Sequence, residues 1–460
     1  MISLARWPKV RELREKLNGK AKAEKGYRFY LLYDKVFRKD FLEAAYAQCR
    51  ANGGAPGVDS KTFEDIEAYG RERYLAELAE ELKDRRYEPQ PVRRVLIPKE
   101  NQPGKFRPLG IPTIRDRIVQ QAVKLLLEPI FEADFTDNAY GYRAGKSAHA
   151  AIEHVATGLR NGYTEVVDAD LSKYFDTIPH HELMRSVERR VADPKVLGLI
   201  RRWLKVPVHE VNERGKTVIS GGKKTKQGTP QGGVISPLLA NIYFRRFLMA
   251  WAKFGLEQKC QSQVVNYADD FVILTRGCAK PALLAAHKIL KSIGLTLNEA
   301  KTRVCQVWKE SFDFLGYTFG VQYSRSNRRY LGKTPGKKGV AKYRETVRQI
   351  TASKQVSKTP ETMAAKLNQV TRGYWNYYRL GTTVQLRHQL DGYLWERVQI
   401  WAERKYKRPR KSTGAKRQPA RYVRRLTDKL RAKLVYGREL PRDHHSREAL
   451  QEGAAACFVQ

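Results

Sequence analysis

The sequence predicts an α+β fold, in which short β-rich runs alternate with longer helical patterns. Three such runs lie at residues 164–169, 263–274 and 312–319. Apolar residues at helical spacing fill segments between them, such as Pro281 to Ile293. The third observation is charge, because the 460 residues include 87 Lys and Arg against 48 Asp and Glu, a formal net charge of +39. Such an excess is typical of a protein that binds a polyanion.

The first 90 residues mix basic and apolar positions at helical spacing, interrupted by a glycine-rich loop at residues 53–57. The clearest helix is predicted from Pro112 to Glu132, since proline suits the first turn of a helix. Apolar residues recur there at near-helical spacing. They are Ile114, Ile118, Ala122 and Leu125.

The most informative stretch runs from Asn266 to Leu274 and reads Asn-Tyr-Ala-Asp-Asp-Phe-Val-Ile-Leu. It predicts a tight hairpin that carries the adjacent carboxylates Asp269 and Asp270. A third carboxylate, Asp170, follows the run at 164–169. Phosphoryl transfer to a nucleic-acid 3′ end needs carboxylates that hold two divalent cations roughly 4 Å apart. Because Mg²⁺ favours oxygen ligands, these three aspartates are the predicted catalytic and metal-binding residues.

Between these acidic segments lies Gln227 to Leu238, whose glycines permit close backbone approach to a ligand. In this order, the three segments resemble a reverse transcriptase, specifically the group II intron reverse transcriptase or maturase. The resemblance extends from Tyr33 to Gly381. Its further motifs are Asn52–Asp59, Ile97–Lys99 with Arg107–Pro112, Tyr140–Arg143, Leu297–Thr302 and Phe312–Gly316.

The resemblance implies a right-hand polymerase with fingers, a palm made of a small antiparallel sheet backed by helices, and a helical thumb called domain X. Beyond Phe319, glycines and lysines predict a flexible basic connection, and helical patterns resume near Lys342. The predicted domains are an amino-terminal extension with the start of the fingers (1–90), fingers and palm (91–320), thumb (321–400) and a basic tail (401–460).

Strand geometry alone does not select Asp170 over Asp168, because residues two apart share a face. The choice rests on the family pattern, in which the ligand stands five residues before the aromatic Phe175. That ring is implied to pack under the incoming sugar and to disfavour a 2′-hydroxyl. Basic residues near the motifs are candidates to neutralise the triphosphate. The implied nucleotide-binding set is Lys99, Arg107, Leu171, Phe175, Gln231, Gly232 and Lys301.

Aromatic and basic residues alternate from Arg372 to Arg379, a combination that can stack on bases and contact phosphates. The i, i+3, i+4 spacing of Tyr374, Tyr377 and Tyr378 equally suits a helix core. From Glu403 to Lys433 there are 14 basic and 2 acidic residues. The predicted nucleic-acid contacts are Asn52, Gly54, Arg372, Tyr374, Trp375, Arg379, Lys405, Arg408 and Arg410.

The sequence therefore predicts an RNA-directed DNA polymerase of a mobile group II intron that binds intron RNA and assists splicing. Its partners would be intron RNA, a DNA target and primer strand, and deoxynucleoside triphosphates, with two Mg²⁺ ions, or Mn²⁺ in their place. One alternative is a splicing cofactor with incidental polymerase activity. Another is a host-adopted relative serving in phage defence, retron synthesis, spacer acquisition or repair.

The five cysteines are scattered, without C-x-x-C spacing for zinc, and are expected to be reduced. Nothing resembles the H-N-H endonuclease with paired cysteines that ends some maturases. The primer is therefore expected to come from a nick or a nascent strand. Charge appears too early for a signal peptide, so we expect a cytoplasmic protein, nucleoid-associated on DNA, with no membrane partner.

Overall fold

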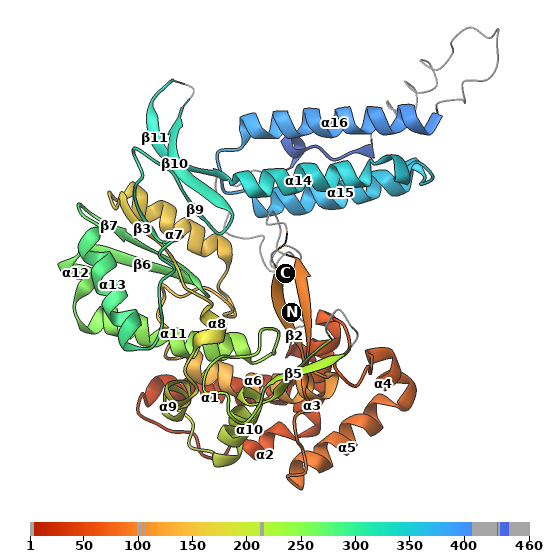
Figure 1. Cartoon of the computed structure of the whole chain (residues 1–460), viewed down its shortest axis with the longest axis vertical. Helices are drawn as coiled ribbons and strands as arrows, with labels where there is room; N and C mark the ends of the chain where they lie inside the picture. Colours follow the sequence, from red (N-terminus) through yellow and green to blue (C-terminus); the bar gives the residue numbers. More distant parts are fainter. Residues whose placement is uncertain are drawn as a thin grey trace. The chain divides into compact units, whose positions relative to one another are not determined.

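The computed structural model describes residues 4–98, 104, 106–211, 216–324, 326–406, 430 and 433–440. The chain forms two compact units, of residues 1–147 with 169–303 and of residues 148–168 with 304–460 (Figure 1). These bounds differ from the predicted domain limits because helix α7 (Ala148–Arg160) packs within the second unit, where Glu153 pairs with Lys333. None of the described helices is apolar and long enough to span a membrane.

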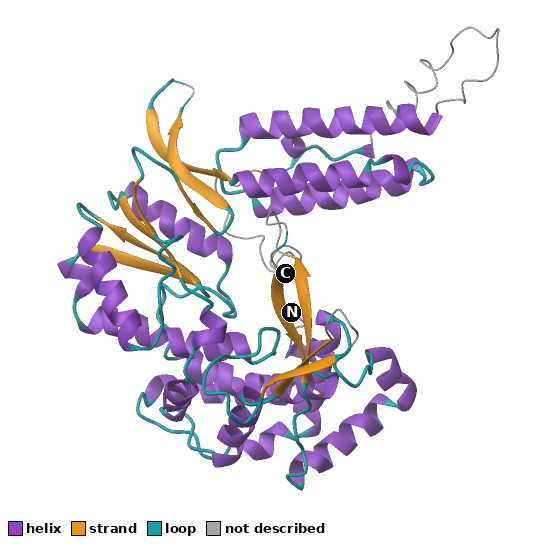
Figure 2. Ribbon diagram, in the orientation of Figure 1, coloured by secondary structure: helices purple, strands orange, loops and turns teal. Residues whose placement is uncertain are grey.

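Helices dominate the first unit (Figure 2). Helices α1 and α3 pack against α6, and α11 packs against α9 and α13. The helices of this unit are α1 (Pro8–Ala23), α2 (Tyr33–Val36), α3 (Lys39–Asn52), α4 (Phe63–Tyr69), α5 (Arg71–Lys83), α6 (Ile114–Glu132), α8 (Tyr174–Thr177), α9 (His180–Glu188), α10 (Pro194–Leu204), α11 (Ser236–Lys253), α12 (Leu256–Lys259) and α13 (Lys280–Ser292).

Helix α6 confirms the clearest predicted helix, and the four apolar residues expected on one side are all buried. It begins at Ile114 rather than at Pro112, because Thr113 is the N-cap and its hydroxyl accepts a hydrogen bond from the Asp116 amide. Pro129 lies inside the helix and supplies no N–H to the Leu125 carbonyl. The Arg14 guanidinium of α1 donates to that carbonyl instead, at 2.6 Å. The helix therefore continues through a proline because a neighbouring helix satisfies its free carbonyl.

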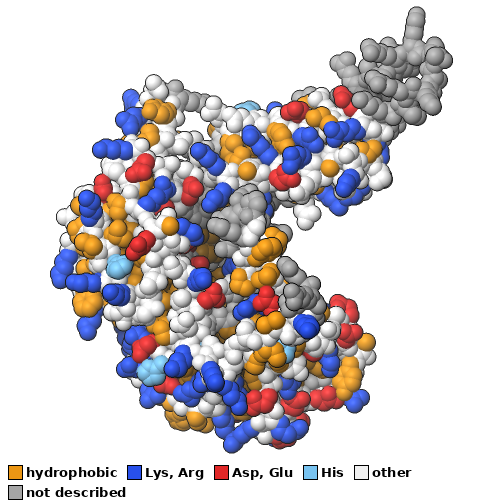
Figure 3. Space-filling model, viewed as in Figure 1, with side chains coloured by type: hydrophobic (Ala, Val, Ile, Leu, Met, Phe, Trp, Pro, Cys, Tyr) orange, Lys and Arg blue, Asp and Glu red, His pale blue; other side chains and the backbone are white. Residues whose placement is uncertain are grey.

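The first sheet of this unit has the strand order β2-β1-β4-β5. Its strands are β1 (Val92–Pro98), β2 (Phe106–Ile111), β4 (Pro207–Val211) and β5 (Thr217–Gly221). Strand β1 pairs antiparallel with β2 and parallel with β4. Leu96, Ile97 and Phe106 remain 46%, 43% and 51% exposed, and hydrophobic side chains follow these strands on the visible face (Figure 3). Such exposed apolar area is a surface that a ligand or partner can cover.

A four-stranded sheet with the order β6-β7-β3-β8 carries the acidic segments. Its strands are β3 (Glu165–Asp170), β6 (Ser262–Tyr267), β7 (Asp270–Thr275) and β8 (Arg303–Gln306). The β-rich run at 263–274 is thus a hairpin, as predicted, with β6 and β7 antiparallel and Tyr267 opposite Asp270. Because residues 271–275 are buried, the hairpin is anchored in the core while its turn remains accessible.

In the second unit, the β-rich run at 312–319 contains two strands. It forms β9 (Phe312–Phe314) and β10 (Tyr317–Tyr323), joined by Leu315 and Gly316 at φ +47° and +75°. Two positive φ angles define the turn that suits a two-residue hairpin. The predicted flexible connection is wrong at 329–335, because β11 (Arg329–Pro335) pairs along the whole of β10.

Three helices follow, α14 (Lys337–Ile350), α15 (Pro360–Tyr377) and α16 (Val384–Tyr406), with α14 packed against both others. Residues 433–440, here called the clasp, return to α15 and α16. Asn368 donates to the Lys433 carbonyl and accepts from the Val435 amide, both at 2.8 Å. The Asp391 carboxylate accepts from the amides of residues 437 and 438. Residues 401–406 belong to helix α16 and residues 433–440 pack on the thumb helices, so these described parts of the predicted tail are not free.

Candidate active site

The acidic pair lies at the turn of the β6–β7 hairpin. Because Tyr267 pairs with Asp270, only Ala268 and Asp269 form the turn. Ala268 has φ +60°, a left-handed conformation that non-glycine residues rarely adopt. It is 5% exposed, whereas Asp269 is exposed and Asp270 half-buried. The strained turn therefore projects the carboxylates away from a rigid base.

The segment Asn138 to Gly141 fixes this turn. The Asn266 amide donates to the Asn138 carbonyl at 2.9 Å, and the Tyr140 amide donates to the Asn266 carbonyl at 2.8 Å. The Asn266 side chain donates to the Ala268 carbonyl at 2.8 Å. A Cβ atom on Gly141 would lie 2.4 Å from the Ala268 nitrogen. Glycine at position 141 therefore permits the backbone contact that supports the acidic turn.

Asp170 ends strand β3 and is surrounded by the turn at residues 296–302. The Asn298 amide donates to the Asp170 carbonyl at 2.8 Å, and its side chain donates to Asp170 Oδ2 at 3.2 Å. Lys301 Nζ lies 3.2 and 3.1 Å from the two carboxylate oxygens. The Asp170 amide donates to the Thr302 hydroxyl at 3.4 Å. This turn therefore holds both the backbone and the carboxylate of Asp170.

The carboxylates of Asp170 and Asp269 interact electrostatically. Desolvation by the surrounding protein raises the pKa of Asp269, although its side chain reaches solvent, and the negative charge of Asp170 raises it further. The charges of Arg107 and Lys301 oppose these two effects. A carboxylate whose ionisation is disfavoured by burial and by a neighbouring negative charge belongs to a site that a bound cation stabilises.

The donor set fits a hard cation, because all three predicted ligands are carboxylates. Nevertheless, no group of three or more carboxylate, imidazole or thiol side chains that could hold a metal ion is found in the described part of the chain. The binding of two divalent cations by the three aspartates therefore stays a prediction. The Asp170 carboxylate is instead paired with the Lys301 ammonium.

Residues predicted to contact the nucleotide meet around the loop at 227–233. Gln231 Nε2 donates to both carboxylate oxygens of Asp176, at 3.1 and 3.2 Å, and Arg107 Nε donates to Gln231 Oε1 at 3.4 Å. The Gly110 amide donates to the Gln231 carbonyl at 2.6 Å, and Gly232 has φ +107°. Arg107 and Gln231, both named in the predicted nucleotide-binding set, therefore contact each other, with Asp176 as an additional partner.

The aromatic Phe175 is 8% exposed, and its carbonyl accepts a hydrogen bond from the Thr229 amide at 2.7 Å. Leu171 is also buried, at 5%, and bridges to Leu297. Both lie on the segment that follows Asp170. Lys99 lies outside the described residues.

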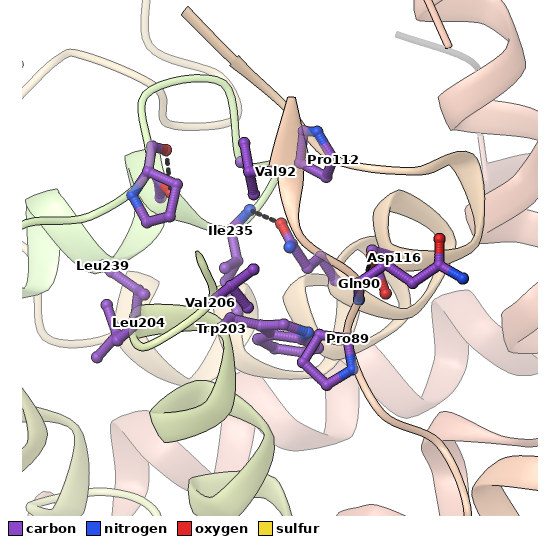
Figure 4. Close-up of a pocket in the computed structure, with 14 residues that line it drawn as sticks. Pro89, Gln90, Val92, Pro112, Asp116, Trp203, Leu204, Val206, Ile235 and Leu239 are labelled. Carbon is purple, nitrogen blue, oxygen red and sulfur yellow. Dashed lines mark hydrogen bonds between the residues drawn. The ribbon is translucent and has the colours of Figure 1, made fainter. Parts of the chain in front are cut away.

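A small apolar cavity lies behind the loop at 227–233 (Figure 4). The Ile235 amide donates to Gln120 Oε1 at 3.4 Å, and the Ser236 hydroxyl donates to the Pro230 carbonyl at 2.9 Å. Trp203 and Leu239 complete its wall. Because the cavity is lined mainly by apolar core residues, we infer that these residues support the loop.

The comparisons with known proteins agree with this geometry. Residues 97–319 match the family described as reverse transcriptase (RNA-dependent DNA polymerase), and residues 340–422 match the group II intron maturase-specific domain. Protein YkfC of Escherichia coli (strain K12) is 34% identical over 357 residues, which cover 69% of this chain and 90% of that protein. The chain belongs to the group II intron reverse transcriptase family.

Other members of this family are longer than the matched region. The group II intron-encoded protein LtrA of Lactococcus lactis subsp. cremoris is 38% identical over 232 residues, 50% of this chain and 36% of LtrA. The 91 kDa protein in the cob intron of Schizosaccharomyces pombe is 25% identical over 442 residues, 79% of this chain and 53% of that protein. The chain thus spans about half or less of these two relatives.

In the terms of this reverse transcriptase family, the predicted right-hand architecture is confirmed. Following the predicted domain names, we call sheet β2-β1-β4-β5 with helices α1 to α6 the fingers and sheet β6-β7-β3-β8 the palm. Helices α14 to α16, which fall within or beside the maturase-specific match, are called the thumb.

The thumb residues differ in their availability to nucleic acid. Arg372 is exposed and Arg379 half-buried. Tyr374 and Trp375 are 2% and 1% exposed, because they pack in the core between α14, α15 and the clasp. The prediction that bases stack on these two rings is therefore wrong. Lys405 donates to the carbonyls of residues 356 and 358, which is a structural contact.

The two predicted contacts of the amino-terminal loop, Asn52 and Gly54, are both exposed. Asn52 ends helix α3 and is exposed. Gly54 has φ +100°, and a Cβ there would lie 3.3 Å from the Arg117 guanidinium. Arg117 also donates to the carbonyls of residues 53 and 55, so this loop is ordered by α6. Arg408 and Arg410 lie outside the described residues.

Sequence reasoning missed the residues that support the aspartates. Asn298 stands in a motif already noted, three residues before Lys301, but a polar residue in a turn has no distinctive signal. Asn241, which donates to the Gly141 carbonyl at 2.7 Å, lies in helix α11 among mainly apolar residues. It is 9% exposed, and only the structure shows this burial.

Proposed function

We propose that this protein is the RNA-directed DNA polymerase of a mobile group II intron and that it also binds its intron RNA to assist splicing. The observation that carries the proposal is the placement of Asp269 on a supported hairpin turn, close enough to Asp170 for their charges to interact. Membership of the family supports the same reading. The protein would act in the cytoplasm and on nucleoid DNA.

Asp170, Asp269 and Asp270 would hold two Mg²⁺ ions, or Mn²⁺ in their place. When bound, such ions activate a primer 3′-hydroxyl and stabilise the leaving pyrophosphate. Arg107 and Lys301 would supply fixed positive charge beside the transferring phosphoryl group. The positive charges of both residues lower the pKa of Asp269.

The nucleotide would lie against the loop at 227–233. Gln231 is oriented by Asp176 on one side and Arg107 on the other, so its amide is held before substrate arrives. Phe175, fixed through its carbonyl to this loop, would contact the sugar and favour deoxynucleotides. Lys99 belongs to the same proposed set.

RNA and DNA would be bound by charge distributed along the chain. The 33 Lys and Arg residues against 10 Asp and Glu in residues 321–460 favour contact with phosphates. In this part we propose Arg372 and Arg379 as contacts, with Arg408 and Arg410 beyond the thumb. Asn52 and the loop at 53–57 would contact intron RNA from the fingers.

A splicing assay with a polymerase-deficient variant tests the two activities separately. Asp269→Ala with Asp270→Ala should abolish DNA synthesis, because these carboxylates serve the chemistry, and should leave protein-assisted splicing of the intron RNA intact. Equal loss of splicing and synthesis would contradict the proposal that the activities are separable. Retention of synthesis would contradict the assignment of the site.

A further inference from the structure

The contacts of Lys301 suggest a role before substrate binds. Its ammonium lies within 3.2 Å of both oxygens of Asp170, so it faces the same lone pairs that a divalent cation would use. Its side chain is 60% exposed, and that of Asp170 is 41% exposed. An exposed Lys–carboxylate pair is weak and easily exchanged.

Asn298 holds Asp170 in a different way. Its backbone amide donates to the Asp170 carbonyl, and the Lys301 amide in turn donates to the Asn298 carbonyl at 3.0 Å. The Asn298 side chain reaches only Oδ2. Removing the Lys301 ammonium would therefore leave Asp170 positioned by the turn, with its negative charge unpaired.

We propose that Lys301 is an exchangeable counter-ion of Asp170, which neutralises the carboxylate in the nucleotide-free enzyme and leaves it when a divalent cation binds. Asn298 is a positioning residue that keeps the carboxylate in place through this exchange. The released ammonium is then available to the triphosphate of the incoming nucleotide. The inference rests on the proposed function, since it assumes that Asp170 binds a cation.

The flexible lysine stem and its compact charge suit this exchange. Cation binding competes with Lys301, and Lys301 sets the cation concentration at which Asp170 becomes available.

Binding of Mn²⁺ to the full-length, nucleotide-free protein, measured by electron paramagnetic resonance, tests this competition. Lys301→Met should bind Mn²⁺ about 1.5- to 5-fold more tightly, which is the range expected for loss of an exposed ion pair. Lys301→Arg should restore affinity toward wild type. The matched control is Lys35→Met, since Lys35 also contacts both oxygens of an aspartate, Asp34, at 2.9 and 2.7 Å. It should leave Mn²⁺ affinity unchanged.

Kinetics supply a second readout in which a purely structural role would behave differently. In Lys301→Met, the Mg²⁺ concentration for half-maximal DNA synthesis should fall, while KM for the deoxynucleotide should rise. Unchanged or weaker Mn²⁺ binding by Lys301→Met would overturn the counter-ion proposal. Asp170→Asn distinguishes the counter-ion proposal from the proposed metal site. Unchanged Mn²⁺ binding in that variant would overturn the metal site itself.

Discussion

At the scale of single residues, the acidic turn depends on backbone conformations that few side chains permit. Ala268 adopts φ +60° in a buried position and is contacted closely by Gly141. Asn266 and Asn241 then tie this contact to the palm. The carboxylates are thus placed by neighbours that carry no charge.

Gly141→Ala should lower both stability and activity, because a Cβ at this position collides with the Ala268 nitrogen. Overpacking of this kind costs about 1–3 kcal/mol of unfolding free energy. The midpoint of thermal unfolding and the rate of primer extension measure the effect. The control is Gly198→Ala in helix α10, where a Cβ meets nothing within 4 Å and should stabilise the helix by about 0.5–1 kcal/mol. A wild-type rate in Gly141→Ala would contradict the role of this contact.

His180 predicts a dependence of stability on pH. Its Nε2 contacts the Gly228 carbonyl at 2.6 Å, and burial lowers its pKa below the ordinary value. A lowered folded-state pKa favours the neutral ring, so the stabilisation is present above about pH 6.5 and is lost as pH falls through the folded-state pKa. The unfolding midpoint of wild type should therefore fall more steeply than that of His180→Gln as pH is lowered from about 7 to 5. Parallel curves would show that His180 does not titrate in this way.

At the scale of elements, the clasp completes the thumb. Arg387 donates to the carbonyls of residues 437 and 440 and lies 4.6 Å from the Trp375 ring. Gly437 packs directly on that ring, since a Cβ there would overlap it. The aromatic core of α15 is therefore covered by a segment that lies some 60 residues further along the chain.

Asn368→Ala should destabilise the thumb by about 1–3 kcal/mol, because the clasp loses two hydrogen bonds, one from the half-buried Val435 amide and one to the exposed Lys433 carbonyl, each worth about 0.5–1.5 kcal/mol. Hydrogen exchange at residues 433–440 should become faster. Asn376→Ala, an exposed asparagine of the same helix, is the control and should leave exchange unchanged. Equal exchange rates in the two variants would mean that the clasp is held by other contacts.

At the scale of the whole molecule, the excess of positive charge is the most distinctive property of this chain. Individual basic residues nevertheless have different roles. Arg372 is exposed and assigned to phosphate contact, whereas Lys405 is engaged with two carbonyls. Arg372→Ala should lower the slope of log affinity for RNA against log salt by about one unit. Lys405→Ala should lower the unfolding midpoint and leave that slope unchanged. The opposite pattern would reverse the two assignments.

Much of this architecture could be predicted from the sequence where a motif or an apolar periodicity marks the element. The hairpin around Asp269 followed from its motif, and helix α6 followed from apolar periodicity. The turn at Leu315 could not be predicted, because leucine gives no signal for a positive φ. The burial of Trp375 and the pairing of Lys301 with Asp170 depend on contacts between distant segments, which spacing along one segment does not report.

Primer extension on an RNA template tests the central claim most directly. With Mg²⁺ and a DNA primer, the wild-type protein should incorporate deoxynucleotides in preference to ribonucleotides. Chelation of the metal, or Asp170→Ala in a protein that unfolds at the wild-type temperature, should abolish the product. RNA-templated synthesis that persists in folded Asp170→Ala, or its absence from the wild-type protein, would contradict the account.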